Sequence, residues 1–378
     1  MQYRRFGKTG RELSVITLGG MRFKHGWDRP REELPQATID NCRDMVQRAL
    51  ACGINHFESA FGYVKSESVY GRVLNQELRV PRDSYHLMTK GAPKTADDVK
   101  KLIEIQLKSL QVDHIDLYAY HGLNNAEVYA GAVAKGGPVE ALLAYKEQGV
   151  LGEVGFSTHA PVEIIQSAIE TQLFSFVNLH YYYFNQRNAP AVELAAKHDL
   201  GVFIISPNDK GGQLFNPPAL LRDACAPLTP IQWNARFCLS SPHVHTLTFG
   251  MTAPSHVEEM LGVLPASAPA DAHVQAAKAK LDACLARDPY SGYEGYELLG
   301  DPSGIVIPEV LRLRKLWKCY DMLDFGRYRY NFLKAPDHWY PGAFASDENL
   351  AKVDRSKLPK DIDVIALLRE AHQAFYRA

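Results

Sequence analysis

The sequence contains little cysteine. Six cysteines are scattered through 378 residues, with no C-x-x-C pair and no tight cluster with histidine. Zinc and iron–sulfur sites need several closely spaced ligands, and a disulfide framework needs a denser set of cysteines. We therefore expect reduced thiols packed as small apolar side chains, with no metal ion and no iron–sulfur cluster.

Long apolar runs and an excess of either charge are also missing. Lysine and arginine number 42 against 43 aspartate and glutamate residues, and no block of like charge would attract nucleic acid or a membrane surface. Proline, glycine or charge interrupts each apolar run well short of a membrane span, and the first seven residues lack the apolar core of a secretory signal. We expect a cytoplasmic protein that acts on a small molecule, with no nucleic-acid or membrane partner. The sequence does not predict its oligomeric state.

A glycine-rich phosphate loop is missing as well. The first β-like run ends in Leu18-Gly19-Gly20-Met21-Arg22, which leads into no G-x-G-x-x-G motif. A doubly wound parallel sheet normally carries that motif after its first strand. The sequence therefore disfavours that architecture.

Short β-branched runs alternate with longer helical patterns from about residue 13 to residue 262, the rhythm of βα units around a parallel sheet. Eight runs have the character of strands: residues 14–18, 54–58, 84–89, 115–120, 152–156, 176–179, 201–205 and 246–249. Apolar residues recur at helical spacing in segments between them, namely residues 38–51, 96–110, 138–148, 161–171 and 189–198. This pattern predicts an α/β fold, a closed (β/α)8 TIM barrel.

The rhythm changes after residue 265. Three further helical patterns cover residues 273–286, 308–322 and 362–377. We expect a barrel over residues 1–265 and an α-helical C-terminal extension over residues 266–378 that packs on the barrel.

Four polar side chains fall at the carboxyl ends of three successive predicted strands. Glu58 ends the second strand and Tyr63 follows it. Lys90 ends the third strand, and His121 follows the fourth. In a barrel the active site lies at this end of the strands. Any one of these residues alone is commonly structural, but the four together indicate a reaction site.

These residue types suit the reduction of a carbonyl group. Hydride addition to a carbonyl creates an alkoxide that needs a proton, and Tyr63 can give one. The charge of Lys90 would lower the pKa of Tyr63 from its usual value of about 10, and Glu58 would hold Lys90 in place. His121 would donate a hydrogen bond to the substrate oxygen.

With these motifs the sequence resembles the aldo-keto reductase superfamily over most of residues 1–265. The resemblance implies a catalytic tetrad in which Tyr63, Lys90 and His121 are unchanged, Glu58 replaces an aspartate, and Val64 replaces the glycine that usually follows the tyrosine. It implies an NAD(P)H-dependent oxidoreductase that reduces an aldehyde or ketone to an alcohol by hydride transfer, with Tyr63 as general acid. The matching stretches are residues 53–67, 89–90, 116–121, 152–157, 202–207 and 250–260.

The resemblance also implies residues that bind the cofactor. Ser157, with Thr158 beside it, and Asn178 would hold the nicotinamide carboxamide, which needs both a donor and an acceptor. The resemblance implies NADP(H) rather than NAD(H). We expect this preference to be modest, because Gly250 and His256 stand where relatives usually carry the basic residues that bind the 2′-phosphate. Further contacts to the cofactor are expected from Gly20, Met21, Ser206, Lys210, His256 and Glu259.

The sequence leaves a second function open. Glu58, the weakened phosphate site, and Ile205 in place of the aromatic residue that normally stacks on the nicotinamide also fit a nicotinamide-binding sensor or regulatory barrel with little turnover. Residues 304–309 resemble the tail of a branch of the family that carries an iron–sulfur domain, so we expect a cluster-free relative of that branch.

The substrate is predicted only as a small carbonyl compound with some apolar character, because loops set specificity and the fold does not. Aromatic residues are expected around the mouth of the barrel: Trp27, Phe61, Tyr120 and Tyr181.

Overall fold

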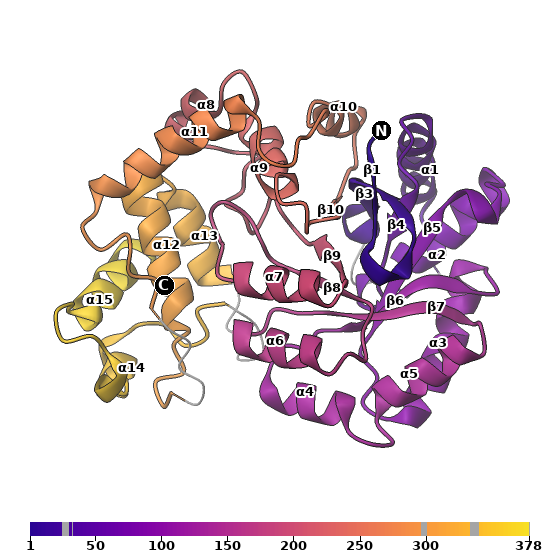
Figure 1. Ribbon diagram of the computed structural model, residues 1–378, viewed down its shortest axis with the longest axis horizontal. Helices are drawn as coiled ribbons and strands as arrows, with labels where there is room; N and C mark the ends of the chain where they lie inside the picture. Colours follow the sequence, from indigo (N-terminus) through magenta and orange to yellow (C-terminus); the bar gives the residue numbers. More distant parts are fainter. Residues whose placement is uncertain (25–29, 32, 296–300, 333–339, 378) are drawn as a thin grey trace. The chain divides into compact units, whose positions relative to one another are not determined.

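Eight parallel strands close into a barrel (Figure 1). The computed structural model describes residues 1–24, 30–31, 33–295, 301–332 and 340–377. Each strand pairs in parallel with the next, and β10 pairs with β3 to complete the ring. Every predicted strand overlaps one barrel strand, so the predicted TIM barrel is confirmed. The strands are β3 (Ile16–Gly19), β4 (His56–Glu58), β5 (His86–Gly91), β6 (Ile115–His121), β7 (Leu151–Ser157), β8 (Phe176–Leu179), β9 (Gly201–Ile204) and β10 (Thr246–Phe249).

Helices alternate with these strands along the chain and surround them (Figure 1). Helix α3 shows how the sequence sets such an element. Thr95 Oγ1 accepts a hydrogen bond from the Asp98 backbone nitrogen at 3.2 Å, and the Thr95 nitrogen donates to Asp98 Oδ2 at 3.0 Å, so a capping box starts the helix. The helices are α1 (Gln36–Ala51), α2 (Ser66–Arg72), α3 (Ala96–Leu110), α4 (Ala126–Val133), α5 (Pro138–Glu147), α6 (Val162–Glu170), α7 (Ala189–Lys197), α9 (Pro230–Leu239) and α10 (Pro254–Leu261).

An N-terminal hairpin, which the sequence did not predict, precedes the barrel. Strands β1 (Tyr3–Arg5) and β2 (Glu12–Ser14) pair antiparallel. Phe6 and Leu13 are fully buried and pack with barrel residues such as Phe176, whose ring centroid lies 5.5 Å from that of Phe6. The hairpin therefore contributes apolar side chains to the core of the barrel.

The chain divides into two compact units. The first comprises Met1–Thr158, Val162–Pro207 and Asn234–Ala270, and holds the barrel. The second comprises His159–Pro161, Asn208–Trp233 and Asp271–Ala378. That the C-terminal extension packs on the barrel stays a prediction.

The second unit is helical, as predicted for the C-terminal extension. Arg314 of α12 donates to Glu370 of α15 and to Asp288, at 2.6 Å in each case, and thereby ties these segments together. The predicted helix over residues 308–322 ends at Tyr320, because Asp321 takes a left-handed conformation and a separate helix starts at Leu323. The helices are α8 (Ala219–Cys225), α11 (Ala272–Ala283), α12 (Ile307–Tyr320), α13 (Leu323–Phe332), α14 (Asp347–Leu350) and α15 (Val364–Phe375). Among the described residues, none of the helices has the length and apolar character needed to cross a bilayer.

Candidate active site

Lys90 contacts two of the other strand-end residues that the sequence singled out, Glu58 and Tyr63. Its Nζ donates to Glu58 Oε1, to the Ser59 carbonyl oxygen at 2.8 Å and to the Tyr63 hydroxyl at 3.3 Å. Glu58 ends β4, Lys90 lies in β5, and Tyr63 ends a short 3₁₀ turn, η3 (Phe61–Tyr63). Lys90 is only 1% exposed and Glu58 2%. Charges buried so deeply are costly unless paired, so the ammonium and the carboxylate hold each other in place.

The longer side chain of Glu58 fits this site. Its second oxygen, Oε2, accepts a hydrogen bond from Thr248 Oγ1 at 3.2 Å. A Cβ atom at Gly19, the strand neighbour of Glu58, would lie 3.1 Å from that oxygen and 2.6 Å from Thr248 Oγ1. A glycine opposite the carboxylate therefore leaves room for glutamate where the family resemblance implied aspartate.

His121 joins this cluster from the end of β6. Its ring lies perpendicular to that of Tyr63, with 5.9 Å between the ring centroids, and both side chains are half-buried. The structure thus brings all four predicted catalytic residues together at the carboxyl-terminal rim of the barrel.

The protonation of Tyr63 differs from the expectation based on sequence. Burial raises the pKa of Tyr63 well above its usual value, and the positive charge of Arg22 opposes this rise only in part. Burial also lowers the pKa of Lys90, while the Glu58 carboxylate favours its charged form. Loss of solvation thus shifts the pKa of Tyr63 in the direction opposite to the one expected from Lys90.

A buried carboxylate lies behind the cluster. Glu67 of α2 is fully buried, and its Oε1 accepts hydrogen bonds from Thr89 Oγ1 and Gln106 Nε2, both at 2.6 Å. Gln106 Nε2 also lies 3.2 Å from the carbonyl oxygen of Lys90. Burial raises the pKa of Glu67, and these donors, with Arg31, oppose that shift. The network therefore braces the strand segment that carries Lys90.

Arg31 connects this carboxylate to the turn that carries Tyr63. Its Nη1 lies 2.9 Å from Glu67 Oε2, and its Nη2 donates to the Phe61 carbonyl oxygen at 2.6 Å. Sequence reasoning missed both Arg31 and Gln106. Gln106 had a signal, since it interrupts the buried stripe of α3 that includes Val99 and Ile103. Arg31 had none, because it lies in an irregular segment before α1.

Val64, directly after Tyr63, has an unusual backbone conformation. Its φ is 53° and its ψ is −94°, a region that suits glycine and crowds a β-branched side chain. This conformation explains why the resemblance implies glycine here, and it places local strain next to Tyr63.

Three of the predicted residues form a row across neighbouring strands. His121 pairs with Ser157 across β6 and β7, and Ser157 pairs with Asn178 across β7 and β8. Asn178 is fully buried, its Nδ2 lies 3.4 Å from Met88 Sδ, and its Oδ1 has no hydrogen-bond partner among the described residues. Ser157 Oγ accepts from the Gly122 nitrogen at 3.2 Å, which leaves its hydroxyl hydrogen available. One acceptor and one donor therefore stand side by side, as a carboxamide requires.

Two other predicted cofactor residues, Thr158 and Gly20, have structural roles within the protein. Thr158 Oγ1 donates to the Leu123 carbonyl oxygen at 2.6 Å. A Cβ atom at Gly20 would lie 2.2 Å from Ser66 Oγ, so close packing alone requires glycine there. Met21 is 38% exposed, and Ser206 has a positive φ of 50° after β9. Their contacts with a cofactor stay predictions.

The remaining predicted cofactor residues are Lys210, His256 and Glu259. His256 is exposed in the first turn of α10, where its Nδ1 accepts a hydrogen bond from the Thr252 nitrogen at 3.2 Å. Glu259 is half-buried on the same helix, and Lys210 belongs to the second unit. Of the predicted mouth residues, Trp27 lies outside the described residues and Tyr120 is buried.

A closed barrel with a polar cluster at its carboxyl-terminal rim is the architecture of a TIM-barrel enzyme. Residues 15–214, more than half of the sequence, match the aldo/keto reductase family. The chain belongs to this family of oxidoreductases, whose members use nicotinamide cofactors on small carbonyl compounds.

Known proteins agree with this assignment. The chain is 25% identical over 248 residues to the uncharacterised oxidoreductase YrpG of Bacillus subtilis, covering 59% of this chain and 71% of that protein. It is 29% identical over 131 residues to L-galactose dehydrogenase of Arabidopsis thaliana, covering 32% of this chain and 39% of that protein. In fold it is similar to the aldo-keto reductase AKR11C1 of Bacillus halodurans in its holo form, with a TM-score of 0.62, 19% identity, and coverage of 74% of this chain and 96% of that one.

Proposed function

We propose that this protein reduces an aldehyde or ketone to an alcohol with NAD(P)H, and that Tyr63 is the general acid. The observation that carries the proposal is the position of Lys90 Nζ, which donates to the Glu58 carboxylate and lies 3.3 Å from the Tyr63 hydroxyl. A paired, buried ammonium next to the phenol would stabilise the phenolate that forms when Tyr63 gives up its proton.

Ser157 and Asn178 would hold the cofactor by its carboxamide. The unpartnered Asn178 Oδ1 would accept from the amide nitrogen, and the Ser157 hydroxyl would donate to the amide oxygen. When bound, the reduced nicotinamide supplies the hydride for the carbonyl carbon. Asn178 is fully buried, and this interaction would give its Oδ1 atom the hydrogen-bond partner that a buried polar atom needs.

Tyr63 and His121 would act on the substrate oxygen. His121 donates a hydrogen bond to the carbonyl oxygen and fixes its angle, and Tyr63 transfers its hydroxyl proton to that oxygen as negative charge develops there. The raised pKa of Tyr63 is compatible with this step, because an alkoxide is a stronger base than a phenolate. Lys90 stabilises the phenolate that forms, and a proton from solvent restores Tyr63 after the alcohol leaves.

Oxidation of NADPH and of NADH, followed by absorbance with a panel of activated aldehydes, ketones and quinones, tests this function. We expect turnover with at least one aldehyde or ketone, and loss of that turnover in Tyr63→Phe. Tight cofactor binding without turnover of any carbonyl compound would contradict the proposal and would favour a nicotinamide-binding sensor.

A further inference from the structure

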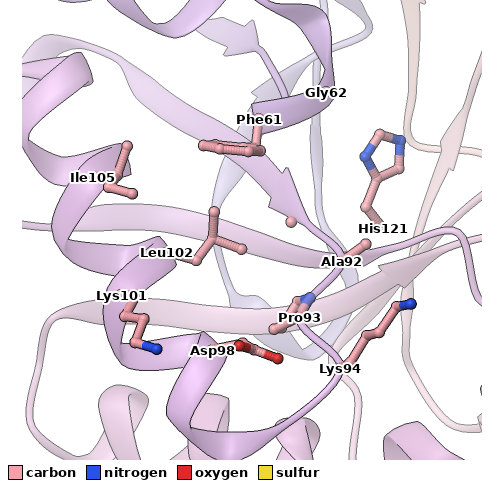
Figure 2. A pocket seen from close by; sticks show the side chains of 11 residues that line it. Phe61, Gly62, Ala92, Pro93, Lys94, Asp98, Lys101, Leu102, Ile105 and His121 are labelled. Atoms are coloured by element: carbon pink, nitrogen blue, oxygen red, sulfur yellow. The ribbon is translucent and has the colours of Figure 1, made fainter.

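A cavity of about 370 Å³ opens next to the candidate active site. His121 and Gly62 line one side of it, so it is continuous with the site where the carbonyl would react. The opposite side is apolar and is formed by Phe61 of η3 with Leu102 and Ile105 of α3 (Figure 2). Its volume is within the range of small-molecule sites, and it lies wholly within the first unit.

The edge of this cavity carries an excess of positive charge. Lys94, in the segment after β5, and Lys101 of α3 line it and are exposed (Figure 2). Neither lysine forms a salt bridge with any residue that the structure describes. Asp98, the carboxylate that also lines the cavity, is engaged in the capping box with Thr95. The two lysines flank the cavity edge from opposite sides, and the carboxylate between them, Asp98, is hydrogen-bonded in the capping box and lies near the charge of Lys101 (Figure 2).

Ile105 is unusual for an apolar residue in α3. It is 45% exposed, whereas Val99 and Ile103 on the same helix are buried against the barrel. Together with Phe61 and Leu102 it gives the cavity an apolar wall that no described side chain covers completely. A flat apolar or aromatic group would bury this wall and gain the corresponding hydrophobic free energy.

We propose that this cavity, the α3 groove, binds the non-reacting part of the substrate, which has an apolar or aromatic body and an anionic group. The inference rests on the proposed function, since it places the reacting carbonyl at His121 and Tyr63. The body lies on Phe61, Leu102 and Ile105, and the anionic group, a carboxylate or a phosphate, lies at the edge that Lys94 and Lys101 flank. The substrate class is therefore an anionic aryl or alkyl aldehyde or ketone.

The test compares two probes that differ only in charge, 4-formylbenzoate and its methyl ester. Calorimetry measures the dissociation constant of each probe with and without excess NADP⁺, and the tighter value of each pair is used. We expect the carboxylate to bind about fivefold to tenfold more tightly than the ester, since two lysines attract it. The ratio of the two dissociation constants is the readout, so any change in the protein that alters both constants equally cancels.

Lys94→Met/Lys101→Met should reduce this ratio to less than about twofold. The matched control is Lys100→Met/Lys108→Met, which removes two exposed lysines from the same helix that do not line the groove, and it should keep the wild-type ratio. Equal binding of both probes to the wild type, or a preference that survives in Lys94→Met/Lys101→Met, would overturn the α3 groove as an anion-binding subsite.

Tyr63→Phe separates this inference from the proposed function. It should keep the preference for the carboxylate while it loses turnover. If the wild type prefers the carboxylate but turns over neither probe nor any other carbonyl compound, the groove is supported and the proposed function fails. If the wild type reduces both probes but binds them equally, the function is supported and the groove fails.

Discussion

Arg31 and Phe61 are joined twice. The Arg31 Nη2 atom donates to the Phe61 carbonyl oxygen at 2.6 Å, and its guanidinium carbon lies 3.9 Å from the centroid of the Phe61 ring. Phe61 opens the turn that ends in Tyr63, and Arg31 is itself held by the buried Glu67 carboxylate. The position of Tyr63 therefore depends on a residue that makes no contact with the proposed reacting atoms.

Replacement of Arg31 tests this positioning role. Arg31→Gln should lower kcat about tenfold to a hundredfold, because a small displacement of a general acid costs that much. Arg31→Lys keeps the charge but loses the two-pronged contact, and its loss should be smaller. The dissociation constant for NADPH should change less than about twofold, since Arg31 is not placed at the cofactor.

Arg43→Gln is the control for the Arg31 variants, because Arg43 forms only partly exposed ion pairs with Asp40 and Glu77. It should leave kcat unchanged. Melting temperatures identify any variant that has simply unfolded. Wild-type kcat in Arg31→Gln, with the fold intact, would show that Arg31 does not position Tyr63.

The strained backbone at Val64 predicts an effect on stability. Val64→Gly and Val64→Ala both remove the branched side chain, but only glycine removes the Cβ atom that disfavours a φ of 53°. Val64→Gly should therefore be more stable than Val64→Ala by about 1 kcal/mol, after allowance for the greater freedom of glycine in the unfolded chain. Urea unfolding measures the difference, and an alanine variant as stable as the glycine variant would mean that this backbone is not strained.

Discrimination between NADPH and NADH should be modest. A charged contact missing at the 2′-phosphate costs roughly 1.5–3 kcal/mol, and Gly250 and His256 provide no permanent charge. Fluorescence titration with both cofactors gives the ratio of dissociation constants. A preference for NADPH above about a thousandfold, or roughly 4 kcal/mol, would refute this expectation. Arg22, whose Cγ would lie 2.4 Å from a Cβ atom at Gly250, would then be the group to replace by methionine.

His245 makes the stability of the barrel dependent on pH. Burial and the charges of Arg4 and Arg5 lower the pKa of His245 to about 4, and its Nδ1 accepts a hydrogen bond from the Val202 nitrogen at 2.9 Å. In the unfolded chain its pKa is about 6.5. As the pH falls from about 6.5 towards 4, the unfolded chain binds a proton that the folded chain does not, so the free energy of unfolding decreases.

Urea unfolding at about pH 7 and about pH 4.5 measures this loss, which should amount to about 2.5 kcal/mol from His245 alone. His245→Asn keeps an acceptor for the Val202 nitrogen and removes the titration. The variant should lose correspondingly less stability over the same interval. Identical losses in the variant and the wild type would contradict the role of His245.

The barrel could be predicted from the sequence because its signal is local. Each of its strands overlaps a short run that contains a β-branched residue, and the eight runs are separated by helical patterns, so their order is readable before any contact is known. Strand β1 was not predicted, because it has only three residues and two of them are arginine. Helix α13 was not predicted, because Gly326 and a mixture of aromatic and charged residues obscure the apolar periodicity of its buried face.

The candidate site was predictable where it lies at strand ends. Glu58, Lys90 and His121 stand at positions that a barrel must bring to one rim. Arg31 and Lys101 come from an irregular segment and from an outer helix, and only tertiary contacts place them. The direction of the pKa shift of Tyr63 could not be predicted either. It depends mainly on how deeply the folded chain buries the phenol, which the sequence does not give.

Lys90 and Tyr63 should act as one unit in the proposed reaction. Lys90→Met removes the charge next to the phenol and should reduce kcat about as much as Tyr63→Phe does. The double variant Tyr63→Phe/Lys90→Met should therefore be little worse than either single variant. Losses that multiply in the double variant would mean that the two residues act independently.

The most direct test of the account is the kcat of Tyr63→Phe with the best carbonyl substrate. The variant keeps the ring and removes only the proposed proton donor, so kcat should fall about a hundredfold to ten-thousandfold. The dissociation constant for NADPH should stay within about twofold of the wild-type value, because the phenol is assigned to the substrate. A kcat close to that of the wild type would contradict the assignment of Tyr63 as the general acid.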